Sequence, residues 1–249
     1  MAEVLTTPTL LLCQYPPEMA LEPAGGWTLP NPNDQQRLQQ YSSVAARTQF
    51  ALSRLLLAQA MPFLVDEADP DWVLTARSGG QPVLRHLNST EVPLSISHTP
   101  GLVAIALAPT NTLVGVDVES WTRPLRLTRL LDASMSAQDA AWIKRQALPA
   151  RGFIQHWTLK EACLKCLGKG IAADLLALSF NLTEERIALR SSPYSDRKYW
   201  YFEQLSLLPD YCISLAYAAQ HAVNASWQER LFAPMLQLSG YRLRMLQYS

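Results

Sequence analysis

The chain has little charge and few lysines. Charged residues make up 17% of its 249 residues, against about 25% in an average globular chain. Its 21 basic and 21 acidic residues cancel to a formal net charge of zero. Such a chain lacks the long-range field that draws nucleic acid or an anionic membrane surface to a basic protein. Recognition of an anion must therefore be local, and the sparse lysines indicate one place, because Lys160, Lys165 and Lys169 lie close together in the sequence.

Long apolar runs and leader features are missing as well. No stretch approaches the about 18 consecutive apolar residues that predict a transmembrane helix. The segment from Met1 to Cys13 has no cationic leader and no clear small-residue cleavage site. We therefore expect no secretory signal and a cytoplasmic location.

Cysteine is scarce too. Four cysteines do not make a disulfide framework in a chain of this size, because such scaffolds are short and cysteine-dense. Cys163 and Cys166 form a C-x-x-C pair, but no second pair and no histidines at zinc-ligand spacing accompany them. We expect free thiols, with this pair packed inside a helix.

Hydrophobic periodicity predicts a mixed α+β fold. A long amphipathic helix is expected from Asp34 to Ala60, ended by Pro62, and further helices at 134–147 and 153–167. Apolar and β-branched runs predict the strands, at 9–14, 72–76, 92–97, 102–108, 113–119, 176–182, 187–190, 199–208 and 211–218.

An internal echo suggests two related halves. The apolar run 102–108 follows a Pro-Gly turn, and the similar run 211–218 follows Pro-Asp. This places a boundary near Asn111, with a first half at 1–111, a second half at 112–220 and a tail at 221–249. The tail has no functional interpretation.

Two carboxylates stand side by side on the predicted strand 113–119. Alternate side chains of a strand share a face, so Asp117 and Glu119 point one way while Val116 and Val118 point the other. Like charges this close repel each other unless protons or a cation lie between them, and Mg²⁺ is a usual solution. The alternative is a strand with one solvated face.

The predicted helix 153–167 carries a second pair of charges. Glu161 and Lys165 are four residues apart and share a helix face. They are either a surface ion pair or a third carboxylate for a metal and a cation for phosphate. Gly168 and Gly170 are typical of a helix C-terminus.

A third group lies where a strand enters the Pro100–Gly101 turn. Ser97 and His98 stand there beside Thr99, and backbone amides at such a turn can cradle a phosphate. A structural histidine is the alternative reading.

In this order, the three groups resemble the motifs of the Sfp-type 4′-phosphopantetheinyl transferases, over about Arg37 to Tyr217. The resemblance implies an α+β (α/β) pseudo-two-fold fold of two similar halves, with coenzyme A between them. It implies an enzyme of the holo-carrier-protein synthase type. Such enzymes transfer 4′-phosphopantetheine from coenzyme A to a serine of an apo acyl or peptidyl carrier protein and release adenosine 3′,5′-bisphosphate. The length is that of the monomeric type.

Two alternatives belong to other classes. One is a catalytically idle coenzyme A-binding module of the same fold, against which the full set of carboxylates argues. The other is an unrelated Mg²⁺-dependent phosphotransferase, but the sequence has no P-loop.

The resemblance also implies roles in catalysis. Asp117, Glu119 and Glu161 correspond to the ligands of Mg²⁺, or of Mn²⁺ in its place. Glu161 also corresponds to the base that takes the serine proton, directly or through water. Lys160 and Lys165 correspond to phosphate contacts, with Lys165 stabilising the transition state.

The remaining implied roles concern coenzyme A, and they fall mostly in the first half. Ser97 and His98 resemble a phosphate-binding pair. The other matching positions are an Arg-Thr pair for the 3′-phosphate and a Gly-x-Pro turn against the adenine, at Arg47, Thr48, Gly80, Gln81 and Pro82.

Two departures reduce the positive charge around coenzyme A. Gln81 stands where the family commonly has a basic residue, and Asp34 begins a segment in which Arg37 is the one obvious basic residue. We expect a weaker dependence on the 3′-phosphate than in a fully basic relative.

A carrier protein, typically acidic around its modified serine, also needs a docking surface. Arg123, Arg126 and Arg129 recur at three-residue spacing and would form a basic ridge on a helix. Solvated surface arginines are the alternative. No nucleic-acid or membrane partner is expected.

Overall fold

The computed structural model describes residues 8–21, 29–64, 72–77, 80–170, 175–183, 186–194, 199–219, 229–230, 236–238 and 241–248. The helices are α1 (Pro32–Leu38), α2 (Val44–Leu64), α3 (Leu127–Ser134), α4 (Ala137–Lys144) and α5 (Pro149–Cys166). The strands of the first half are β1 (Thr9–Gln14), β2 (Trp72–Ala76), β3 (Pro82–His86), β4 (Glu91–Thr99) and β5 (Leu102–Leu107). The later strands are β6 (Leu113–Ser120), β7 (Ser179–Leu182), β8 (Ile187–Ser191), β9 (Tyr199–Leu205), β10 (Tyr211–Ala219), β11 (Glu229–Arg230), β12 (Leu236–Leu238) and β13 (Tyr241–Tyr248).

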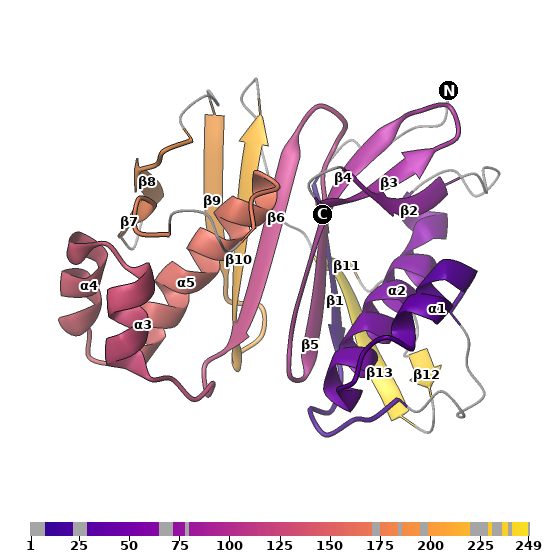
Figure 1. The fold of residues 1–249 in the computed structure, drawn as a ribbon, viewed down its shortest axis with the longest axis horizontal. Coiled ribbons are helices and arrows are strands. Elements are labelled where there is room, and N and C mark those ends of the chain that lie inside the picture. The colour runs from indigo at the N-terminus through magenta and orange to yellow at the C-terminus, as the bar shows by residue number, and fades with distance from the viewer. Residues whose placement is uncertain are drawn as a thin grey trace.

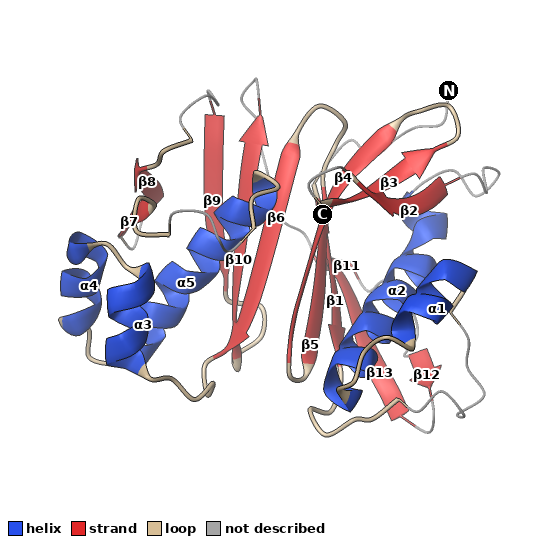
Figure 2. Cartoon of the chain, in the orientation of Figure 1, coloured by secondary structure: helices blue, strands red, loops and turns tan. Residues whose placement is uncertain are grey.

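Two antiparallel sheets pack face to face, and a long helix covers the outer face of each (Figure 1). The apolar layer between the sheets includes Leu10 and Leu12 of β1 together with Val116 and Val118 of β6. Helix α2 packs against β1 and β5 on one side, and α5 packs against β6 and β10 on the other (Figure 2). The fold is therefore α+β, with a core in each layer.

The two halves repeat one topology. In the first half the sheet order is β1-β5-β4, with α2 and the β2–β3 hairpin inserted between β1 and β4 along the chain. In the second half the order is β6-β10-β9, with α5 and the β7–β8 hairpin inserted in the same places. The apolar runs that echo each other in the sequence are β5 and β10, which occupy equivalent positions. The expectation of two similar halves is confirmed.

Several element boundaries differ from the sequence expectations. The expected helix at 34–60 is two helices, because α1 ends at Leu38 and α2 begins at Val44. Pro62 lies inside α2, where it removes a backbone donor in the last turn without ending the helix at that point. The expected helix at 134–147 is also divided, because the Ser136 hydroxyl accepts a hydrogen bond from Asp139 N and so begins α4.

The last strands join the first half. Strand β13 pairs antiparallel with β1, from Leu10 opposite Tyr248 to Gln14 opposite Arg244. The sheet of the first half is thus extended by residues from the far end of the sequence. Among the described residues, no helix is long and apolar enough to cross a membrane.

Candidate active site

The two sheets meet along β4 and β6, where hydroxyl side chains link the strands. The Ser95 hydroxyl accepts a hydrogen bond from Val116 N (3.1 Å), and the Ser97 hydroxyl accepts one from Val118 N (3.3 Å). One face of β4 therefore supplies the acceptors that a neighbouring strand's carbonyls would otherwise provide. We call this line of contacts, which also includes Thr99, the hydroxyl seam.

The same hydroxyls orient the carboxylates of β6. Ser97 donates to Asp117 Oδ1 (2.8 Å), and Thr99 donates to Glu119 Oε2 (3.3 Å). Ser97 is buried with 4% of its surface exposed. Its hydroxyl is therefore committed to a carboxylate, whereas the sequence led us to expect a phosphate contact.

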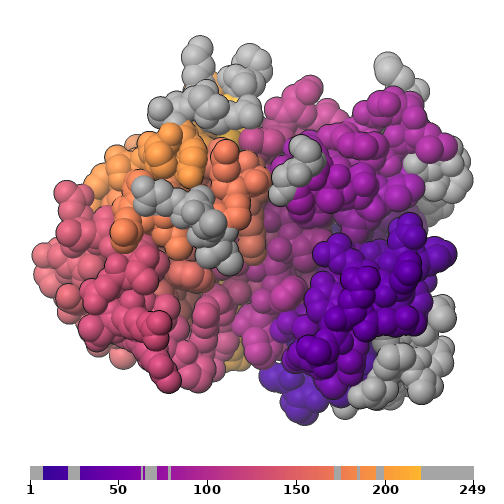
Figure 3. All heavy atoms as spheres, viewed as in Figure 1, coloured from indigo at the N-terminus to yellow at the C-terminus, as the bar shows by residue number. Residues whose placement is uncertain are grey.

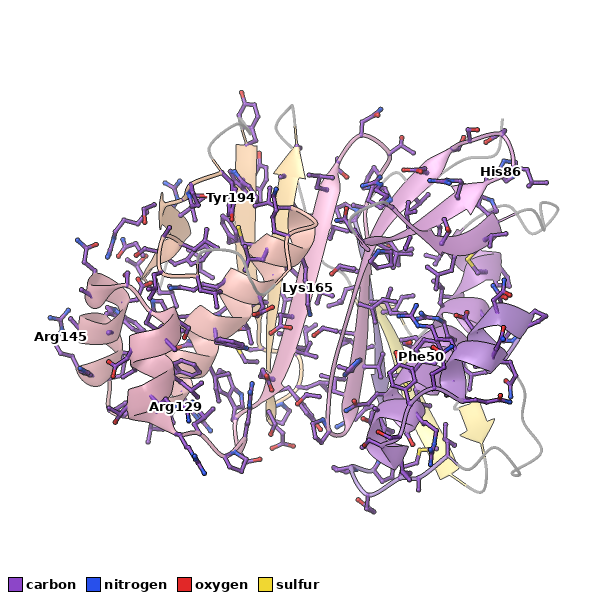
Figure 4. All side chains as sticks on the ribbon, viewed as in Figure 1. Phe50, His86, Arg129, Arg145, Lys165 and Tyr194 are labelled. Carbon is purple, nitrogen blue, oxygen red and sulfur yellow. The ribbon has the colours of Figure 1, made fainter. Side chains whose placement is uncertain are left out.

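Asp117 lies beneath α5. Its Oδ1 also accepts a hydrogen bond from Lys165 Nζ (2.7 Å), and Lys165 Nζ donates further to the Val116 carbonyl (3.2 Å). Its Oδ2 is buried and has no hydrogen-bond partner. Hydrogen bonds therefore fix one oxygen of Asp117, Oδ1, while the other, Oδ2, is available to bind a ligand. Figure 4 shows Lys165 near the middle of the molecule, beside β6.

Glu161 faces the same place from α5. It is 6% exposed, and its Oε1 is buried without a hydrogen-bond partner. The pKa of Glu161 is raised to about 7, chiefly by burial; the charges of Asp117 and Glu119 contribute to the rise, and Lys165 opposes it. Two buried carboxylate oxygens, one from β6 and one from α5, thus lack a donor.

Glu119 lies at the open end of the group. Its Oε1 pairs with Arg123, four residues later. Burial raises the pKa of Glu119, Arg123 lowers it and Asp117 raises it. The prediction that Asp117 and Glu119 share one face of the strand is confirmed, because Val114, Val116 and Val118 pack together on the other face.

Gly115 lets α5 approach β6 closely enough to bring these groups together. A Cβ atom at Gly115 would lie 1.9 Å from the Ala162 carbonyl oxygen and 2.5 Å from Cys166 N. Both are backbone atoms of α5, so no side-chain rotation would relieve the overlap. The close approach depends on the absence of a side chain at this position.

The donor set of these carboxylates fits a hard divalent cation, because Mg²⁺ and Ca²⁺ prefer carboxylate oxygens. Within the described part of the chain, however, no three His, Cys, Asp or Glu side chains lie together as a metal-binding group. Lys165 and Arg123 instead lie against Asp117 and Glu119. The two unpartnered oxygens, Asp117 Oδ2 and Glu161 Oε1, are the positions that a cation would complete.

The two halves lie side by side in Figure 3. Two adjoining pockets lie beside this group, the first lined by residues of both halves and the second by residues of the first half alone. One, of about 280 Å³, is lined by Gln81, Lys165, Lys169 and neighbouring residues. The other, of about 370 Å³, is lined by residues that include Arg37 and His98. Both share a wall made by Gly80, Pro82 and Ile96. Together they form a groove with a cationic lining at each end.

His98 lines the second pocket with an exposed side chain. Its pKa is lowered, first by the surrounding protein that displaces water and then by the positive charge of Lys165. Arg54, which the sequence reading missed, lines the same pocket and pairs with Asp34 (3.2 Å).

Arg47 and Thr48 do not line either pocket. Thr48 is buried, and its hydroxyl accepts a hydrogen bond from Leu21 N (3.0 Å). Arg47 donates to the Tyr41 carbonyl (3.0 Å). The structure thus uses both side chains to fix the start of α2, in place of the phosphate contact expected for them.

Lys160 lies on another face of α5 and is fully buried. Its ammonium pairs with Asp139 (3.1 Å) and donates to the carbonyls of Ser134 (2.9 Å) and Leu175 (3.0 Å). Successive residues of a helix are rotated by about 100°, so Lys160 and Glu161 lie on different faces of α5. The expected phosphate contact of Lys160 is not supported, and the residue anchors α5 to α4.

The three arginines expected to form a ridge are exposed, but they do not share a helix. Helix α3 begins at Leu127, so Arg123 and Arg126 precede it and only Arg129 lies on it. Arg151 lies nearby in this part of the fold, with its guanidinium 5.3 Å from the centre of the Trp121 ring.

Comparison with known proteins gives one consistent family. Residues 113–216 match the 4′-phosphopantetheinyl transferase superfamily. A phosphopantetheinyl transferase of a Thraustochytrium species is 27% identical over 195 residues, which cover 72% of this chain and 65% of that relative.

Two solved structures are similar over part of the chain. Holo-acyl-carrier-protein synthase from Thermotoga maritima matches with a TM-score of 0.39 and 16% identity, covering 44% of this chain and 64% of that one. The same enzyme from Neisseria meningitidis matches with a TM-score of 0.35 and 14% identity, covering 43% and 96%.

The buried pair of Lys160 and Asp139 yields a stability prediction. Lys160→Met should lower the free energy of unfolding by about 3–5 kcal/mol, because Asp139 then stays buried without its cation. The double variant Lys160→Met/Asp139→Leu should recover much of that loss. Urea unfolding of both variants measures this, with the exposed Lys144→Met as the matched control. A loss below about 1 kcal/mol in Lys160→Met would contradict the assignment.

Proposed function

We propose that this protein is a 4′-phosphopantetheinyl transferase, which transfers 4′-phosphopantetheine from coenzyme A to a serine of an apo acyl or peptidyl carrier protein; the match of residues 113–216 to that superfamily supports the proposal. The observation that carries the proposal is the group formed by Asp117, Glu161 and Lys165 at the edge of a groove between two halves. In this group, Asp117 and Glu161 each have a carboxylate oxygen without a hydrogen-bond partner. The Lys165 ammonium, which contacts Asp117, can exchange that contact for one with a phosphate.

The proposed reaction is a displacement at phosphorus. The bond from the phosphopantetheine phosphorus to the bridging oxygen of the pyrophosphate breaks, and a bond to the carrier serine Oγ forms. Adenosine 3′,5′-bisphosphate leaves with the bridging oxygen. Glu161 accepts the serine proton, directly or through water.

Asp117, Glu119 and Glu161 would hold a Mg²⁺ or Mn²⁺ ion. Such an ion supplies positive charge to the pyrophosphate and to the leaving group. Lys165 contacts Asp117 at 2.7 Å and lines the groove, so its ammonium can bind a phosphate oxygen of coenzyme A. Ser97 and Thr99 keep the two β6 carboxylates in place.

Mass spectrometry of an apo carrier protein incubated with this protein, coenzyme A and Mg²⁺ tests the proposal. We expect the carrier to gain the mass of phosphopantetheine, and Glu161→Gln to abolish the gain because it removes a carboxylate and the proton acceptor. Lys144→Met, on the surface of α4, is the control and should retain activity. No gain with acyl and peptidyl carriers, while coenzyme A still binds, would instead indicate an idle binding module.

The charge around the second pocket supports a weak dependence on the 3′-phosphate of coenzyme A. Arg54 is paired with Asp34, which leaves Arg37 as the exposed cation of this pocket wall. Gln81, which lines the first pocket, contributes no charge there. Replacing coenzyme A by its 3′-dephospho form should raise the Michaelis constant less than about tenfold, whereas a full charge-assisted contact is worth about 1.5–3 kcal/mol. Asp34→Asn should increase the ratio of the two Michaelis constants by freeing Arg54, and an unchanged ratio would contradict this account.

Arg126 and Arg129 are proposed to attract the acidic carrier, since both are exposed in the second half, Arg126 at the start of α3 and Arg129 on it. We leave Arg123 out of the test because it pairs with Glu119. Arg126→Glu/Arg129→Glu should raise the Michaelis constant for the carrier about tenfold and leave that for coenzyme A unchanged. Steady-state kinetics against each substrate measures this, and an unchanged carrier constant would show that the carrier docks elsewhere.

A further inference from the structure

A side-chain amide joins the two halves at the end of α5. Gln81, which immediately precedes β3, donates from Nε2 to the carbonyls of Lys165 (3.0 Å) and Cys166 (3.3 Å). The last carbonyls of a helix lack the donor four residues later that interior carbonyls have, and the Lys165 carbonyl also accepts from Gly168 N, three residues later (3.0 Å). A residue of the first half therefore supplies a cap for the catalytic helix of the second half.

The other end of the amide is held within the first half. Gln81 Oε1 accepts a hydrogen bond from Arg77 Nη1 (3.2 Å), and Arg77 Nε donates to Glu91 Oε2 (3.0 Å). A backbone hydrogen bond joins the same two residues, because Arg77 N donates to the Gln81 carbonyl (2.9 Å). The chain of contacts runs from Glu91 at the start of β4 through Arg77 and Gln81 to Lys165.

Lys165 is thereby held from two sides. Its main-chain carbonyl accepts from Gln81, and its ammonium donates to Asp117 Oδ1. Gly168, which ends the helix with a positive φ of 65°, packs against the same amide, because a Cβ there would lie 3.3 Å from Gln81 Oε1. The Gln81 side chain thus touches the segment that carries the ammonium.

We propose that Gln81 is a positioning residue that sets the place of Lys165 relative to Asp117, and this inference rests on the proposed function. The position lies between a guanidinium, which only donates, and two carbonyls, which only accept. A glutamine carries the required acceptor and donor on one side chain. A lysine or arginine would keep the donor but turn a second cation toward Arg77.

Four variants separate the parts of this arrangement. Gln81→Met keeps the approximate shape and removes both sets of hydrogen bonds, and Gln81→Lys keeps a donor but loses the acceptor. Arg77→Met removes the anchor of the amide. Arg85→Met is the matched control, because Arg85 pairs with the same Glu91 but makes no contact with Gln81.

Hydrogen exchange of the protein alone provides the first measurement. In Gln81→Met, the amides of Leu167, Gly168 and Lys169 at the end of α5 should exchange at least tenfold faster, while the amides of β10 keep their rates. Arg77→Met and Gln81→Lys should give smaller increases at the same amides. Arg85→Met should leave them unchanged. Unchanged exchange in Gln81→Met would overturn the proposal whatever its activity.

Transfer kinetics provide the second measurement. If Gln81 positions Lys165, kcat should fall about tenfold in Gln81→Met, since a misplacement of about 1 Å can cost that much or more. The Michaelis constant for the carrier should not change. Faster exchange with an unchanged kcat would overturn the positioning role. A wild-type protein that transfers nothing would refute the proposed function and the positioning role with it, while exchange would still report the contact between Gln81 and α5.

Discussion

The hydroxyl seam between β4 and β6 is the contact on which the rest of the site depends. These strands belong to different sheets, so the edge of β6 that faces β4 lacks a backbone ladder. Ser95 and Ser97 bind the Val116 and Val118 amides there, and so satisfy buried donors whose loss would be costly. Because the hydroxyls recur at every second residue, they fix the register of one half against the other. That register decides which carboxylates lie beside Ser97 and Thr99.

A second constraint comes from the other side of β6, where α5 closes over buried carboxylates. Gly115 permits the close approach of α5 to β6. The carboxylates are buried as a result, and burial disfavours their charged forms, so that the pKa of both Glu119 and Glu161 is raised. The ion pair between Lys165 and Asp117 partly offsets the repulsion among these carboxylates. Two of the carboxylate oxygens, Asp117 Oδ2 and Glu161 Oε1, still have no hydrogen-bond donor. Unsatisfied charge of this kind is expected where a fold gives up stability for chemistry. The buried pair of Lys160 and Asp139 anchors the same helix, so α5 is held in this position from its opposite face.

Local patterns predicted much of the fold but only part of the site. Alternation along 113–119 placed Asp117 and Glu119 on one face, and helical spacing placed Glu161 beside Lys165, because both rules act within a few residues. The sequence does not reveal that Ser97 donates a hydrogen bond to the Asp117 carboxylate or that Lys160 forms an ion pair with Asp139. Both contacts depend on how elements that are distant in the sequence pack together. The pairing of β13 with β1 joins the ends of the chain, and no local signal encodes it. The hydrogen bond from Leu21 N to the Thr48 hydroxyl likewise joins residues that are distant in the sequence, so no local pattern predicts it.

The duplicated topology shows how the candidate site comes to lie in one half. Strand β1 is the equivalent of β6, and α2 is the equivalent of α5. On β1, the residues that join the core beneath α2 are Leu11 and Cys13, whereas on β6 the residues toward α5 are Gly115, Asp117 and Glu119. The interface between α2 and β1 is therefore packed with apolar side chains. In the interface between α5 and β6, Gly115 allows the helix to approach closely, and the neighbouring side chains are charged. The first half then acts through its edge: β4 brings the hydroxyls, and the turn before β3 brings Gln81 to the end of α5. The apolar interface between α2 and β1 thus makes the first half a rigid support, and this support holds the charged interface between α5 and β6 in place.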